Sequence, residues 1–288
     1  MGFPIRKGTG PFGTDTWNGT SGSISYTTAS GTPASGDLVL LWIAKDDDVA
    51  PDLPTDGGSA FTSYQSEESN NNMWGALFIK IANGSEGSSI SWGSDSEEGV
   101  AILTVIDGGS LQTGTLADVD SNSQNPWSGV GTAIDAYNTT PDWGTDGDTL
   151  YIAYAGWDSN SVVSSWATSD YPDDQTSVSS STGAGAAGGA AATYSSDGGV
   201  GPGIDIVVLD DAEEWEATTI AIRGATPTLG YLPNAPTPSL RDTTPPTATD
   251  DSTTISINKP DNTADGDLLV AVINFDAEGT ARTFSSTG

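Results

Sequence analysis

The chain has 288 residues, of which 35% are hydrophobic and 36 are glycine, a length sufficient for one large β-sandwich or two small domains. Its 39 Asp and Glu side chains outnumber eight Lys and Arg side chains, and the formal net charge of −31 disfavours nucleic acid and anionic membranes as partners. The sequence contains no cysteine and no histidine, which excludes disulfides, thiolate chemistry and imidazole as a base or metal ligand.

Residues 1–14 form a short N-terminal arm that contains Arg6 and Lys7, two of the eight basic side chains. Local positive charge ahead of an acidic body can anchor a chain to a larger acidic assembly. We therefore expect Ile5, Arg6, Lys7 and Phe12 to contribute to anchoring; a floppy terminus is the alternative interpretation. The arm has no apolar core of signal-peptide length, and no run of the chain approaches the length of a transmembrane helix.

Three later segments share one pattern, in which Gly-Asp precedes a short, mostly apolar run that ends in an acidic turn. They are SGDLVLLWIAKDDD (35–48), DGDTLYIAYAGWDSN (146–160) and DGDLLVAVINFDAEG (265–279). Each copy predicts a buried strand that is entered through a glycine turn. Because similar strands follow the first two copies in the same order, residues 15–224 are expected to form two related halves, about 15–109 and 130–224.

Many short apolar runs separated by turns predict an all-β fold, specifically an antiparallel β-sandwich. The strand around Ile102 is apolar on both faces and should be central, whereas Thr149 suggests that the strand of the second copy lies nearer an edge. The Ala/Gly run at 182–192 has too many glycines for a helix and is interpreted as a loop that leads into a strand.

Residues 225–247 are rich in proline and threonine and predict an extended linker. Residues 248–288 then begin a further, incomplete β module with the third Gly-Asp copy. Two strands cannot bury a core, so we expect either a longer natural polypeptide or completion of this module by another chain.

Carboxylates are the only abundant titratable groups, and two of them can hydrolyse a glycosidic bond. The adjacent pairs are Glu67-Glu68, Glu97-Glu98 and Glu213-Glu214, each predicted at a turn before a strand. Turn solvation explains these pairs more simply than catalysis does, and no catalytic motif accompanies them. We therefore expect no enzyme activity and no catalytic residues.

Asp46, Asp47 and Asp48 follow the first Gly-Asp strand and could wrap a calcium ion, since hard cations prefer several oxygen ligands. Their spacing does not match an EF-hand, and the alternative is an acidic, solvated loop. No other cofactor is indicated.

Four tryptophans in turn-rich segments, if exposed, could stack on sugar rings: Trp127, Trp143, Trp157 and Trp166. The alternative is that they belong to the core, where most tryptophans of a β-domain lie.

The Gly-Asp strands, a later strand ending in Lys-Ile-Ala and a closing strand ending in Arg-Gly together resemble a module of tailed-phage structural proteins. These are tail-fibre, minor-tail and head-fibre proteins, with relatives in bacterial surface proteins. The residues concerned are Gly36-Asp37-Leu38, Lys80-Ile81-Ala82, Ile220-Ala221-Ile222-Arg223-Gly224 and Gly266-Asp267-Leu268-Leu269.

This resemblance implies a jelly-roll-like β-sandwich on a virion surface without catalytic residues. The corresponding hypothesis is a virion-surface protein, a tail fibre or a capsid decoration, whose N-terminus binds other virion proteins while β modules project for host attachment or surface coverage. Self-association and a host-surface glycan are further partners it suggests. The alternatives are a carbohydrate-binding or adhesive module of a bacterial surface protein and, last, a glycosidase with two carboxylates.

Overall fold

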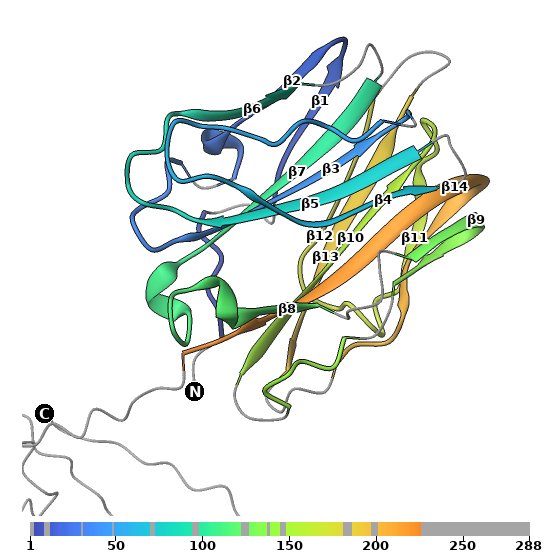
Figure 1. Cartoon of the computed structure of the whole chain (residues 1–288). Helices are drawn as coiled ribbons and strands as arrows, with labels where there is room; N and C mark the ends of the chain where they lie inside the picture. The colour runs from blue at the N-terminus through green and yellow to red at the C-terminus, as the bar shows by residue number, and fades with distance from the viewer. Residues whose placement is uncertain are drawn as a thin grey trace, which may run out of the picture. The chain divides into compact units, whose positions relative to one another are not determined.

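The computed structural model describes residues 3–8, 12–29, 31–47, 49–69, 73–93, 98–121, 127–136, 139–144, 148–180, 186–196 and 201–225 (Figure 1). Apart from Ala225, the expected linker at 225–247 and the expected further module at 248–288 lie outside these residues. The described part is all-β, as expected, and its only helical elements are three short 3-10 turns. No helix within it is long and apolar enough to cross a membrane.

The described part of the chain contains fourteen strands. They are β1 Gly13–Asn18, β2 Ser21–Ser25, β3 Leu38–Lys45, β4 Thr62–Ser69, β5 Met73–Ile81, β6 Ser89–Gly93, β7 Glu98–Ile106, β8 Val119–Ser121, β9 Trp127–Asp135, β10 Thr149–Trp157, β11 Val163–Trp166, β12 Gln175–Ser179, β13 Gly188–Ser196 and β14 Asp205–Arg223. The 3-10 turns are η1 Tyr26–Thr28, η2 Gly108–Ser110 and η3 Leu116–Asp118.

Two antiparallel sheets form the body of the structure. The first sheet has the order β1-β7-β3-β5-β4, and the second has the order β11-β14-β10-β13-β12, with β8 and β9 also paired to β14. A separate two-stranded sheet joins β2 and β6. The antiparallel sandwich is therefore confirmed, whereas the strand order does not confirm a jelly roll, and the origin of the halves by repetition stays a prediction.

The two Gly-Asp strands, β3 and β10, each occupy the middle of a sheet. β3 lies between β5 and β7, and β10 lies between β13 and β14. The expectation that the second copy lies near an edge was wrong, because Thr149 is fully buried and pairs with both neighbouring strands. The strand around Ile102, β7, is an inner strand with both faces buried, as expected.

Three apolar clusters explain why the central strands are apolar on both faces. Alternate side chains of β3, such as Leu40 and Trp42, fill the space between the two sheets, while Leu41 and Ile43 face the other way. That outer face of the first sheet is covered by β2 and β6, and the outer face of the second sheet is covered by residues of β9 and the beginning of β14 (Figure 1). Because both faces are covered, neither central strand shows polar alternation.

The two sheets approach each other closely where β3 faces β10. A Cβ atom added to Gly156 would overlap the Cβ atom of Ala44, so this position of β10 accepts only glycine. Next to it, the Trp42 indole stacks on the Tyr154 ring at 5.9 Å and donates a hydrogen bond to the Ala155 carbonyl at 3.2 Å. The absence of a side chain at Gly156 thus makes room for Ala44 and for the end of the Met73 side chain.

Two turn predictions differ from the structure. Glu213 and Glu214 lie inside β14, at a bulge where its register with β9 shifts, because β14 runs without interruption from the outer layer into the second sheet. Glu67 and Glu68 lie within β4 rather than in a turn before a strand. The Ala/Gly run becomes strand at Gly188, where its small residues form β13.

Substitution Gly156→Ala should destabilise the protein by about 1–3 kcal/mol, because the new methyl group overlaps a methyl group that the β3 backbone holds in place. Ala44→Gly alone should also destabilise, by about 1–2 kcal/mol, through lost burial and added backbone entropy. The double variant should be more stable than the sum of the two single effects, as measured by urea unfolding. Strict additivity would show that the two positions do not clash.

Candidate functional site

The N-terminal arm packs against the first sheet. Its backbone pairs with the end of β7, where Lys7 N–H donates to the Val105 carbonyl at 2.7 Å and Asp107 N–H donates to the Ile5 carbonyl at 2.7 Å. The arm therefore continues the edge at which β1 pairs with β7.

Both basic side chains of the arm form ion pairs with the body. The Lys7 ammonium lies 2.6 Å from the Asp37 carboxylate, and the Arg6 guanidinium contacts the carboxylate of Asp174. Burial lowers the pKa of Arg6, although Tyr154 and Asp173 act in the opposite direction. These two charges are engaged within the chain, and their contribution to anchoring stays a prediction.

Two apolar residues of the arm have opposite environments. Phe12 is 7% exposed, belongs to the core between the sheets and meets the Tyr154 ring edge-on at 6.5 Å. The expectation that Phe12 contributes to docking was therefore wrong, since its ring is needed inside the fold. Ile5 is 60% exposed, and of the four expected anchoring residues it is the one whose side chain faces solvent.

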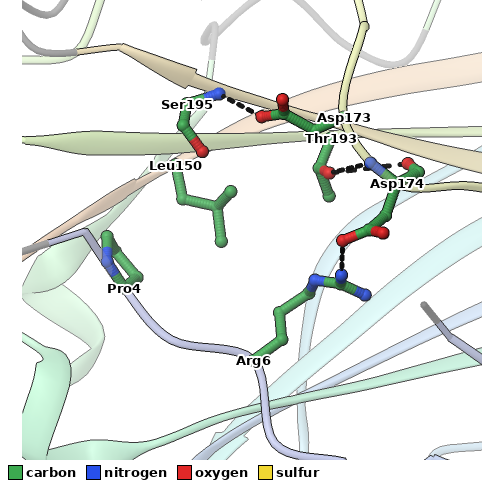
Figure 2. A pocket seen from close by; sticks show the side chains of 7 residues that line it. All are labelled: Pro4, Arg6, Leu150, Asp173, Asp174, Thr193 and Ser195. Carbon is green, nitrogen blue, oxygen red and sulfur yellow. Dashed lines mark hydrogen bonds and ion pairs between the residues drawn. The ribbon is translucent and has the colours of Figure 1, made fainter. Parts of the chain in front are cut away.

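A shallow cleft of about 510 Å³ lies between the arm and the second sheet (Figure 2). Pro4 and Arg6 line it from the arm, and Leu150 lines it from the start of β10. The other lining residues are polar: Asp173, Asp174, Thr193 and Ser195. Asp173 accepts a hydrogen bond from Ser195 N–H at 2.9 Å, and Asp174 N–H donates to the Thr193 hydroxyl at 3.0 Å. The cleft offers carboxylate and hydroxyl groups to a small polar ligand, and its lining includes no aromatic side chain.

The Gly-Asp motif connects three segments at this end of the sandwich. Gly36 has φ of 95°, which favours glycine, and turns the chain into β3. The buried Asp37 carboxylate accepts hydrogen bonds from the backbone N–H groups of Ala34 at 2.7 Å and Gly108 at 3.1 Å, in addition to its ion pair with Lys7. The aspartate therefore joins the turn before β3, the turn after β7 and the arm.

Lys80, part of the Lys-Ile-Ala pattern, lies in a buried ionic network on the outer face of the first sheet. Its ammonium lies 2.5 Å from the Asp56 carboxylate and 3.3 Å from that of Glu86, and 4.7 Å from the centre of the Phe61 ring. Burial alone would raise the pKa of Glu86, but backbone N–H donors and Lys80 outweigh it and hold this pKa at about 2. The Tyr26 hydroxyl donates to Asp56, and burial followed by this bond raises its pKa. The network holds two loops on the sheet.

The two aspartates proposed for calcium that the structure describes, Asp46 and Asp47, do not converge. Asp47 lies 2.9 Å from the buried Lys45 ammonium, Asp46 hydrogen-bonds to Asp158 on the facing sheet, and Asp48 lies outside the described residues. In the described ranges, no group of three or more carboxylates is arranged to hold a metal ion. The calcium hypothesis gains no support from this loop.

The three tryptophans proposed for sugar stacking whose side chains the structure describes do not form a common platform. Trp157 is 1% exposed, with its indole N–H bonded to the Ser161 carbonyl at 3.0 Å, so its expected surface role was wrong. Trp166 packs against the same outer core. Trp143 donates to the Thr149 hydroxyl at 3.1 Å, and Arg223 lies over its ring. The side chain of Trp127 lies outside the described part.

The adjacent glutamates proposed for catalysis have structural partners where they are described. Glu98 accepts a hydrogen bond from the Asn18 amide at 2.6 Å, and Glu213 accepts one from the Ser161 hydroxyl at 2.5 Å. Glu97 and the side chains of Glu67 and Glu68 lie outside the described residues. The first contact joins β7 to β1, and the second joins β14 to the loop after β10. Of these glutamates, none whose side chain the structure describes lines the cleft beside Arg6.

Sequence reasoning missed the residues that matter most for this geometry. The strand pattern marks Asp37 as part of a motif, but only the fold shows which backbone N–H groups donate hydrogen bonds to its carboxylate. Glu86 belongs to no motif, and Asp158 lies in the acidic turn of the second Gly-Asp copy, where the pattern does not indicate that it meets Asp46. Comparisons with protein-family models, curated proteins and solved structures found no match for this chain.

Substitution Phe12→Ala should destabilise the protein by about 3 kcal/mol, because it leaves a cavity in the core between the sheets. The matched variant Ile5→Ala should change stability by less than about 0.5 kcal/mol, since that side chain faces solvent. Thermal and urea unfolding of both variants measure the difference. Equal, small effects would mean that the arm does not pack on the body in solution.

Proposed function

We propose that this chain is a non-catalytic, virion-surface protein of a tailed phage, whose β-sandwich is displayed while its N-terminal arm faces the rest of the particle. The observation that supports the proposal most directly is the place of the two described Gly-Asp strands in their sheets. β3 and β10 occupy corresponding places in the orders β7-β3-β5-β4 and β14-β10-β13-β12, and the same strands carry the resemblance to phage structural modules. A modular scaffold of this kind suits surface display.

The arm supports the proposed orientation. Its strand pairing and ion pairs hold residues 5–7 against the sheet, so that the Ile5 side chain is presented at a defined place. A rigid, exposed aliphatic side chain loses little conformational entropy when a partner covers it. In this proposal Ile5 alone among the four expected anchoring residues contacts the particle, while Arg6, Lys7 and Phe12 position it.

Charge distribution supports display rather than burial in an assembly. The net charge of −31 keeps copies of the chain apart and soluble, and this repulsion is weakest in salt, where screening shortens its range. A displayed module tolerates such a surface, whereas a protein packed on all sides would have to neutralise it.

Particles from the source of this sequence provide the test. On density-gradient fractionation, the chain should co-sediment with intact phage particles, detected by mass spectrometry of the fractions. Recovery only in particle-free fractions, or with the cell envelope, would overturn the proposal and favour the adhesive, glycan-binding alternative.

Anchoring by the arm makes a sharper prediction. Added to particles that lack the chain, the variant Ile5→Asp should bind at least tenfold more weakly than the unmodified protein, because a charge replaces the exposed contact. Val49→Asp is the matched control, since Val49 is also exposed, at 47%, but lies in the loop after β3. Equal loss by both variants would contradict a specific role of the arm.

A further inference from the structure

The opposite end of the sandwich, where β3 and β10 stop, gathers carboxylates between the two sheets. Asp46 is the first residue after β3, and Asp158 is the first residue after β10. Both belong to the faces that point toward the other sheet, because they continue the alternation of Trp42 and Tyr154 in the shared core. A side-chain hydrogen bond joins the two aspartates across the sheets.

The backbone holds both aspartates in place. Asp46 N–H donates to the Glu98 carbonyl at 3.2 Å, and Asp158 N–H donates to the Glu214 carbonyl at 2.9 Å. The close packing of Ala44 against Gly156, two residues before each aspartate, places the two strand ends near each other. The two carboxyl groups therefore meet because the central strands face each other, rather than by flexible side-chain placement.

A hydrogen bond between two carboxyl groups requires that one of them carries a proton. Burial, followed by the negative charges of Asp46, Glu214 and Glu213, raises the pKa of Asp158 to about 7. Burial also raises the pKa of Asp46, with contributions from Asp47 and Glu98. The pair titrates as a unit and retains one proton near neutral pH.

The surroundings contain one cation and many carboxylates. The charged groups on the elements around the pair are Lys45 and Asp47 at the end of β3, Glu98 on β7, and Glu213, Glu214 and Glu216 on β14. Lys45 is already paired with Asp47, and its strand position places it on the opposite face of β3 from Asp46. Glu216 is fully buried and accepts a hydrogen bond from Gly75 N–H at 3.0 Å, so it adds a second polar contact between the sheets. Asp48, Glu97 and the side chains of Glu67 and Glu68 lie outside the described residues.

We propose that Asp46 and Asp158 form a pH-sensitive clasp, in which a shared proton holds this end of the two sheets together and its loss loosens the end. With the proton present, the pair contributes a hydrogen bond between the sheets. Without it, two carboxylates face each other beside Glu98 and Glu214, and their repulsion in a half-buried site is only partly screened.

The sign of the effect follows from linkage. The unfolded chain releases the Asp158 proton near pH 4, whereas the folded chain keeps it until about pH 7. Between these values the folded state binds more protons, so stability must fall as the pH rises. Allowing for the partial exposure of the pair, loss of the shared proton should increase the equilibrium constant for unfolding by roughly ten- to a hundredfold as the pH rises from 5 to 8.

Carboxyl titration in the unmodified protein is the first measurement. Carbon-13 NMR of the aspartate side chains should show that one of the two carboxyl groups titrates near pH 7, and that Asp46→Asn shifts the Asp158 transition toward its ordinary range. Titration of both groups near pH 4 would overturn the proposal, whatever the variants do.

Stability measurements of Asp158→Asn give the second test. This variant should match the unmodified protein near pH 5 and be more stable at pH 8, and the double variant with Asp46→Asn should add little further change. Asp211→Asn is the control, since it removes the same charge from an exposed position of β14. A gain from Asp158→Asn that is independent of pH, or equal to that of the control, would contradict the clasp.

Hydrogen exchange of backbone amides tests whether the structure loosens at the ends of β3 and β10. After correction for intrinsic exchange rates, peptides that contain the ends of β3 and β10 should lose protection several-fold between pH 6 and pH 8.5 in the unmodified protein and keep it in Asp158→Asn. Uniform behaviour of all strands would show that the proton does not act at this end.

Discussion

The two sheets approach each other closely where β3 faces β10, because Ala44 meets Gly156 there and the Trp42 indole lies flat on Tyr154. Polar bonds cross the same space, from Trp42 to the Ala155 carbonyl and from Tyr154 to the Thr104 hydroxyl. A misplaced sheet would leave these groups buried without partners, so the bonds select one register as well as adding stability. The Asp46–Asp158 pair and the docked arm depend on this register, since each lies at an end of these two strands.

Four basic side chains in the described residues show how an acidic chain uses scarce positive charge. Arg6, Lys7, Lys45 and Lys80 each contact a carboxylate, and two of them are fully or almost fully buried. A buried ion pair adds less stability than its Coulomb energy suggests, because both groups lose water. Its stronger effect is to make any other arrangement of the same loops costly, since removing one partner leaves an uncompensated charge. The network around Lys80 therefore specifies where the loops of the first sheet lie.

The local sequence pattern was sufficient to predict the strands, but it did not predict which residues each side chain contacts. The runs at β3, β7 and β10 are apolar on both faces, and the all-β sandwich follows from them. Thr149 was misleading because a single polar side chain reveals little about a strand whose hydrogen bonds are made on both sides. Trp157 was considered for the surface because it lies in a turn-rich segment, and Phe12 was proposed for docking because it belongs to the N-terminal arm. The burial of both depends on chain segments far away in sequence. Asp46 and Asp158 lie in the acidic turns of the first two Gly-Asp copies, but the repeat does not predict that these turns meet across the two sheets.

The two ends of the space between the sheets are held together by opposite electrostatic arrangements. At the end where β3 and β10 begin, the arm brings cations to Asp37 and Asp174, and the exposed part of this contact weakens in salt. At the end where the strands stop, carboxylates gather around Asp46 and Asp158 with a proton in place of a cation. Salt screens repulsion at this second end and attraction at the first. The same change of solvent therefore acts on the two ends with opposite sign, and a single scaffold can respond to salt at its arm and to pH at its far edge.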